Sequence, residues 1–203
     1  MGQYDVSLAE LTQMTDTHSE LDAALNGSGP IAREDVLRWM ERASDLPSLS
    51  QLYRLTGEHY YQIQPDLGAD TECLSIQRYL LECIRLNVEG DEETKDRWEA
   101  AETLHLWLRH LLDLEDRSEV ITKAAHSITD LFLTSGEDVQ IAIEQGFLEH
   151  ALETAALRPF FENWSSVPQL QGAWDRALEW GKAHPDYTWN LVRGLPPRQK
   201  RDE

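Results

Sequence analysis

Apolar residues recur along most of the chain at the three- and four-residue spacing of an α-helix. The clearest stripe consists of Ile121, Ala124, Ala125, Ile128, Leu131 and Phe132. This spacing places all its members on one helix face, which we expect to be buried. Ser118 is a candidate N-cap for this helix, and Ser135-Gly136 a candidate stop. No run alternates apolar and polar residues as a half-buried strand would, so the pattern predicts an all-α protein.

Glycine and proline clusters divide the chain into helical segments. Helices are predicted over residues 6–25, 32–45, 49–63, 71–88, 94–113, 118–134, 138–153, 156–164 and 168–183. Short connections favour antiparallel packing of consecutive helices. We therefore expect about nine helices, arranged as an antiparallel multi-helix bundle or as a short helical solenoid of HEAT or armadillo type. The prediction is a single domain over residues 1–192 and a disordered C-terminal tail over residues 193–203.

The net charge of the chain indicates which kind of partner it binds. The chain has 203 residues, with 18 basic against 37 acidic side chains and a formal net charge of -19. A surface this acidic repels the phosphates of nucleic acids and the head groups of anionic lipids. We therefore expect no nucleic-acid partner and no membrane partner, and predict a basic protein as the partner.

The acidic residues are concentrated around two predicted helices. Residues 89–119 contain eleven acidic and four basic side chains. If helices 94–113 and 118–134 lie side by side and antiparallel, acidic residues gather at both ends of the pair. One predicted edge combines Glu89, Asp91, Glu92 and Glu93 with Glu137 and Asp138, and the other combines Asp113, Glu115 and Asp116 with Asp66 and Asp70.

These two edges are the predicted partner-binding surface. Acidic residues also favour the first turns of helices and keep proteins soluble, which explains part of the pattern. Like charges crowded on one edge repel one another, however, and a cationic partner would offset that repulsion.

Candidate catalytic chemistry is sparse. Glu102 and His105 have the E-x-x-H spacing of carboxylate-bridged metal sites, but the chain has no second such pair. We interpret His105 as a core histidine hydrogen-bonded to a neighbouring side chain, and keep a metal-dependent helical enzyme as an alternative. Glu149 and His150 are adjacent and point about 100° apart, which favours solvation or capping over joint acid–base work. The prediction is a non-enzymatic protein without metal or cofactor.

A cluster of tryptophans near the C-terminal end has two interpretations. Trp164, Trp174, Trp180 and Trp189 could line a peptide groove, because tryptophan is frequent in binding hot spots. Trp174 and Trp180 also follow helical spacing with Leu170, Ala173 and Ala177. We favour core packing for this cluster.

The cysteines and the N-terminal sequence indicate the compartment. Cys73 and Cys83 lie ten residues apart on one predicted helix, about 15 Å, whereas a disulfide needs Cα atoms within about 7 Å. Both are therefore predicted to be reduced thiols. No long apolar segment and no basic leader sequence is present, so we expect a cytoplasmic protein.

Several segments resemble a loose group of small acidic all-helical bacterial proteins. The segments are residues 125–133, 136–139, 146–150, 157–161 and 177–182. Some members of this group look like immunity proteins of polymorphic or contact-dependent toxin systems, and the resemblance covers about residues 70–187. It implies a cytoplasmic inhibitor that binds a co-encoded toxin. The acidic surface itself suggests a basic toxin such as a nuclease, whose phosphate-binding surface carboxylates would cover. The alternative is a helical-repeat scaffold or adaptor that binds a peptide or protein partner without catalysis.

Overall fold

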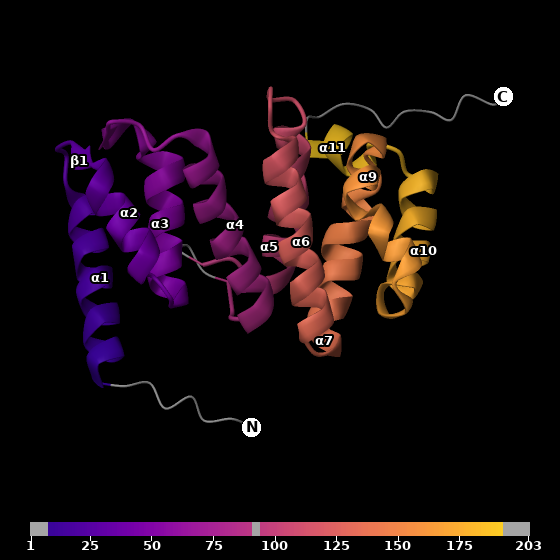
Figure 1. The fold of residues 1–203 in the computed structure, drawn as a ribbon, viewed down its shortest axis with the longest axis horizontal. Helices are drawn as coiled ribbons and strands as arrows, with labels where there is room; N and C mark the ends of the chain where they lie inside the picture. Colours follow the sequence, from indigo (N-terminus) through magenta and orange to yellow (C-terminus); the bar gives the residue numbers. More distant parts are fainter. Residues whose placement is uncertain (1–7, 91–93, 193–203) are drawn as a thin grey trace. The chain divides into compact units, whose positions relative to one another are not determined.

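The computed structural model describes residues 8–90 and 94–192, with side chains from residue 16 to residue 191 (Figure 1). Within these residues the chain is helical almost throughout, which confirms the predicted all-α class. The predicted tail over residues 193–203 lies outside the described residues. No helix in the described part is both long and apolar enough to cross a membrane.

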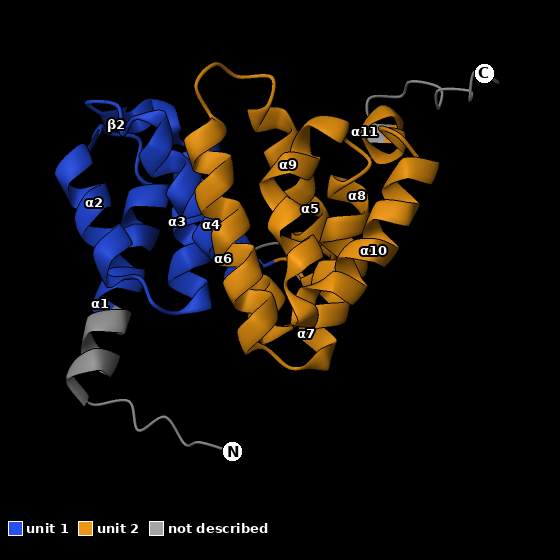
Figure 2. Cartoon of the chain, turned by 45° about the vertical axis from the view of Figure 1, so that its right-hand side comes forward, with its two compact units in different colours: residues 1–82, 90–94 blue, residues 83–89, 95–203 orange. Residues whose placement is uncertain are grey.

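The chain divides into two compact units (Figure 2). Unit 1 consists of residues 1–82 and 90–94, and unit 2 of residues 83–89 and 95–203. The single domain predicted over residues 1–192 stays a prediction.

Unit 1 consists of helices around a small apolar core and one very short pair of strands. Its elements are α1 (Leu8–Asn26), β1 (Ile31–Ala32), α2 (Arg33–Arg42), α3 (Leu46–Glu58), the 3-10 turn η1 (Tyr60–Gln62), β2 (Ile63–Gln64) and most of α4 (Ala69–Leu86). The two strands pair in parallel, with Ile31 opposite Ile63. Helix α1 packs on α3 and α2.

Local capping explains where the predicted helix bounds were wrong. Helix α3 begins at Leu46 rather than at residue 49 because the Asp45 side chain accepts a 2.9 Å hydrogen bond from Ser48 N. In the same way, Asp96 caps α5 by accepting a 2.8 Å hydrogen bond from Glu99 N, so that helix begins at Arg97. The side-chain oxygen of Asp or Asn before a helix replaces a partner that the first N–H groups lack.

Unit 2 contains the end of α4 and all later elements. These are α5 (Arg97–Leu111), α6 (Ser118–Thr134), α7 (Glu137–Ile141), the π-helical segment η2 (Ala142–Leu148), α8 (Glu149–Ala151), η3 (Ala155–Leu157), α9 (Arg158–Phe161), η4 (Glu162–Ser166), α10 (Pro168–Ala183) and α11 (Tyr187–Val192). Helices α6 and α10 have the predicted bounds. Helix α11 and the π-helical segment were not predicted.

The main partner of α5 is the continuous helical segment formed by α7, η2 and α8, which we call the central helix (residues 137–151). A Cβ atom added at Gly146 would lie 3.0 Å from Ala101 Cβ, so the two backbones approach closely. Four residues further along both helices, the rings of His105 and His150 lie 5.4 Å apart. Since both contacts advance in the same direction, α5 and the central helix run parallel. Helix α6 packs on α9 and α7. The side-by-side pairing of α5 and α6 expected from the sequence stays a prediction.

The central helix also contacts α10, and it therefore lies between α5 and α10. A glycine makes the contact with α10 possible. A Cβ atom added at Gly181 would lie 2.5 Å from Leu152 O and 2.8 Å from Glu153 N, which is too close for any side chain. The small residue thus lets α10 cross the end of the central helix against its backbone.

Buried or partly buried arginines bind the C-terminal ends of several helices. The last carbonyls of a helix have no partner within it and carry partial negative charge, so a guanidinium group satisfies both needs. The bonds are Arg78 Nη2 to Ala43 O at 2.7 Å, Arg97 Nε to Ile84 O at 2.7 Å, Arg158 Nε to Leu152 O at 2.9 Å and Arg158 Nη2 to Gly181 O at 3.3 Å. Each of these three positive charges is therefore directed at backbone rather than at surface carboxylates.

Candidate functional site

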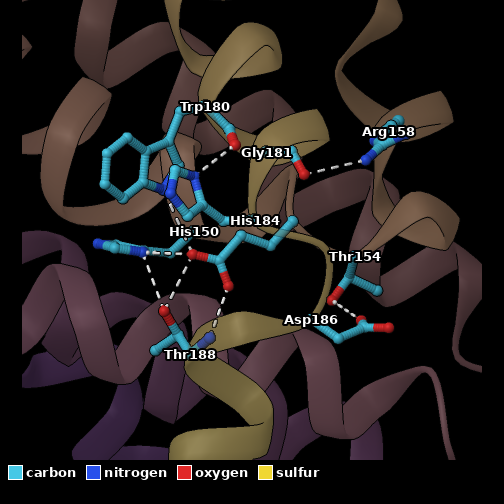
Figure 3. A network of polar contacts seen from close by, with 9 residues as sticks. His150, Thr154, Arg158, Trp180, Gly181, His184, Asp186 and Thr188 are labelled. Atoms are coloured by element: carbon cyan, nitrogen blue, oxygen red, sulfur yellow. Dashed lines mark hydrogen bonds and ion pairs between the residues drawn. The ribbon is translucent and has the colours of Figure 1, made fainter. Parts of the chain in front are cut away.

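Among the described residues of unit 2, the most connected polar side chain is the carboxylate of Glu153, just after α8. Its partners His150, Trp180 and Thr188 are labelled in Figure 3. Its side chain is only 1% exposed. His150 Nδ1 lies 2.9 Å from Oε1, and the hydroxyl of Thr188 donates to the same oxygen at 3.0 Å. The backbone N–H of Thr188 donates to Oε2 at 2.7 Å, and Trp180 Nε1 makes a longer contact of 3.4 Å with Oε1.

This environment keeps Glu153 ionised at neutral pH. Burial works to raise the pKa of the carboxyl group, because a charge is poorly solvated in the protein interior. The hydrogen bonds from His150 and from Thr188 stabilise the charged form more strongly, and the pKa of Glu153 is lowered overall. Glu153 thus places a negative charge at the N-terminal end of α11.

The contacts of Glu153 are among several that hold α11 against the rest of unit 2. Asp186 N donates to Glu153 O at 3.2 Å, and Thr154 Oγ1 donates to Asp186 Oδ1 at 3.2 Å. On the other side, the guanidinium carbon of Arg109 lies 4.8 Å from the ring centroid of Trp189. Helix α11 therefore joins α8 to the C-terminal half of α5.

His105 is buried as predicted, but its predicted hydrogen bond is absent. The residue is 3% exposed, and neither ring nitrogen has a hydrogen-bond partner within the described part of the chain. Burial, together with the neighbouring His150, lowers the pKa of His105 to about 3. The ring is therefore a neutral imidazole in tilted contact with the ring of His150, an arrangement that leaves its polar atoms unsatisfied.

The other candidate catalytic residues do not converge. Glu102 is exposed whereas His105 is buried, so the E-x-x-H pair does not form one site. His150 contacts Glu153, three residues later, and not the adjacent Glu149. Among the described residues, no three His, Cys, Asp or Glu side chains are grouped as metal ligands. Cys73 and Cys83 are buried and form no disulfide.

Two of the four tryptophans of the cluster belong to the core, as predicted, and Trp189 is half-buried. Trp164 is fully buried and Trp174 is 6% exposed. Trp180 differs, since it is 38% exposed and stacks on His184 with ring centroids 4.0 Å apart. The described side chains of this cluster thus leave only a small aromatic surface, beside the Glu153 network.

The predicted acidic edges lie at opposite ends of α6. Glu137 and Asp138 begin α7 directly after it, and Glu115 and Asp116 directly precede it. A helix of 17 residues spans about 25 Å, which separates the two edges by roughly that distance. All four side chains are exposed, and none has an ion pair among the described residues.

The structure describes only some of the remaining residues of the predicted acidic edges. Asp113 is exposed and pairs with Arg109 at 2.8 Å, and Glu89 is exposed in the segment after α4. Asp91, Glu92 and Glu93 lie outside the described residues. Asp66 and Asp70 belong to unit 1, so their approach to the second edge stays a prediction.

Sequence reasoning missed Glu153 and Thr188. The i, i+3 spacing of His150 and Glu153 was a usable signal, because residues three apart meet on a helix surface. Thr188 lies 35 residues further along the chain, and no local pattern connects it to Glu153.

No protein-family model, no curated protein and no solved structure matches this chain.

Proposed function

We propose that this protein is a non-enzymatic, immunity-type inhibitor that acts in the cytoplasm and neutralises a basic co-encoded toxin by binding it. A nuclease fits the role of target, because its phosphate-binding surface is cationic and an acidic inhibitor can cover it. The binding surface in this proposal consists of the exposed carboxylates at the two ends of α6.

One observation supports the proposal above the others. The exposed carboxylates of Glu115, Asp116, Glu137 and Asp138 have no ion-pair partner in the described part of unit 2. Two arginines of the same unit, Arg97 and Arg158, donate to helix-end carbonyls instead. The surface thus keeps a negative field that attracts a cationic protein and accelerates its association.

The first experiment captures the partner. The full chain, immobilised and exposed to host extract at low salt, should retain one basic protein that moderate salt releases. That protein should be encoded next to this chain, should be toxic when expressed alone, and should lose its toxicity on co-expression. A neutral partner that resists salt would support the adaptor alternative and contradict the proposal.

The second experiment tests the surface with the captured protein. The double variant Glu137→Lys/Asp138→Lys should associate about tenfold more slowly and should show a weaker dependence of the association rate on salt. The control, Glu41→Lys/Glu58→Lys, reverses two exposed acids of unit 1 and should keep the wild-type rate. An unchanged salt dependence in the first variant would exclude this edge from the contact.

A further inference from the structure

Trp98, on the first turn of α5, is half exposed and yet fixed in position. Trp98 is 49% exposed. A Cβ atom added at Gly146 would lie only 3.1 Å from Cε3 of the Trp98 ring. The ring thus rests against the backbone of η2, which restricts its motion. An exposed aromatic ring that is already ordered loses little conformational entropy when a partner covers it.

Carboxylates lie on both sides of this ring along the helix axis. Glu102 follows Trp98 by four residues, so the two side chains share one side of α5. Because α5 and the central helix run parallel with Ala101 opposite Gly146, the N-terminal residues Glu137 and Asp138 lie at the same end of unit 2 as Trp98. Glu102 is exposed and has no ion pair among the described residues.

The opposite end of the same pair of helices shows what such a ring and carboxylate bind. There the guanidinium of Arg109 lies 4.8 Å from the ring centroid of Trp189 and also pairs with Asp113 at 2.8 Å. A guanidinium group suits this double contact, because it stacks on an aromatic face while its N–H groups donate to a carboxylate. At the Trp98 end, the ring and the carboxylates are present on the surface of unit 2. The guanidinium of the adjacent Arg97 is bound to Ile84 O, and no arginine of the described residues is stacked on the Trp98 ring.

We propose that Trp98 is the aromatic anchor of a docking surface for an arginine-bearing segment of a partner protein, with the arginine stacked on Trp98 and paired with Glu102. Ile141, which is 38% exposed on the central helix, adds apolar area at the same end of the unit. This inference rests on the proposed function for the identity of the partner, and it adds the chemistry by which that partner is recognised.

Two synthetic peptides, hexa-arginine and hexa-lysine, test this surface on the full chain by calorimetry at low salt. Both carry the same charge, but only the arginine side chain stacks well on an indole ring. Wild-type protein should bind hexa-arginine more tightly. The variant Trp98→Leu should weaken hexa-arginine binding about three- to tenfold and leave hexa-lysine binding nearly unchanged.

A second variant and a control keep the test independent of folding. Glu102→Gln changes only an exposed side chain and should weaken hexa-arginine binding about two- to threefold. Tyr61→Leu removes a more exposed aromatic ring (64% exposed) from unit 1 and should bind both peptides as the wild type does. Thermal unfolding of each variant shows whether it is folded.

The outcomes separate this inference from the proposed function. If both variants keep the wild-type preference for hexa-arginine, Trp98 is not the anchor, while an acidic surface that binds cations remains. If neither peptide binds wild-type protein at low salt, both the anchor and the acidic binding surface are overturned.

Discussion

The two ends of the pair formed by α5 and the central helix use similar side chains in different ways. At one end, Arg109 stacks on Trp189 and Glu153 binds Thr188, so a helix from the same chain covers the polar groups. At the other end, Trp98 and Glu102 remain on the surface of the unit. We call these the closed end and the open end.

The difference separates contacts that stabilise the fold from groups available to a partner. The closed end satisfies a buried carboxylate with several hydrogen bonds, an arrangement whose loss destabilises the folded state. The open end contributes little to that balance, because its carboxylates are solvated and its tryptophan is half covered. Substitutions should therefore affect stability at the closed end and binding at the open end.

The largest expected effect on stability is at the closed end, where α10 crosses the central helix. Gly181→Ala places a methyl group 2.5 Å from Leu152 O and 2.8 Å from Glu153 N, and backbone atoms cannot move aside as a flexible side chain can. We expect a loss of about 3 kcal/mol in the free energy of unfolding, measured in urea by circular dichroism.

A second helical glycine provides the control for that substitution. Gly57 in α3 has no atom within 4 Å of the added methyl group. Gly57→Ala should therefore leave stability unchanged or raise it by about 0.5–1 kcal/mol, since alanine favours the helix. Equal stability of the two alanine variants would show that the close crossing at Gly181 is wrong.

The next effect concerns the carboxylate that fixes α11. Glu153→Gln keeps the size of the side chain but removes its charge and one acceptor, and should destabilise the protein by about 2 kcal/mol. Hydrogen exchange should show faster exchange of the Thr188 amide, whose partner is Glu153 Oε2. Glu179→Gln, an exposed acid on α10, is the control and should leave that amide protected.

The smallest effect concerns the unsatisfied ring of His105 and depends on pH. The unfolded chain protonates this histidine below pH 6.5, whereas the folded protein resists protonation until about pH 3, where the pKa of buried His105 lies. Falling pH therefore favours unfolding across this window, and the contribution between pH 7 and pH 5.5 is about 1 kcal/mol.

His105→Leu should remove that contribution and flatten the dependence of the unfolding free energy on pH. At pH 7 the variant should match or exceed wild-type stability, because an apolar side chain replaces unpaired buried nitrogens. His110→Gln changes an exposed histidine of the same helix and should keep the wild-type pH dependence. A steep profile that persists in His105→Leu would assign the titration to another group.

Patterns within one helix were predictable, and contacts between helices largely were not. The apolar stripe from Ile121 to Phe132 has a strong 3.6-residue period, and α6 has the predicted bounds. Residues 156–164 were predicted as one helix but form three short pieces, η3, α9 and most of η4. The burial of His105 followed from its position on an apolar stripe. Its missing hydrogen bond did not, because it depends on which side chains of the central helix lie beside the ring.

The sequence by itself determined the all-α class, the excess of acidic residues and the separation of the two cysteines. These properties depend on composition or on spacing along a single helix, where 3.6 residues per turn relates position to face. Only the tertiary structure decided that α5 runs parallel to the central helix, that Glu153 binds α11, and that Trp98 rests on Gly146 at the surface. The reason is that these contacts join residues far apart along the chain, and helix packing rather than local spacing brings them together.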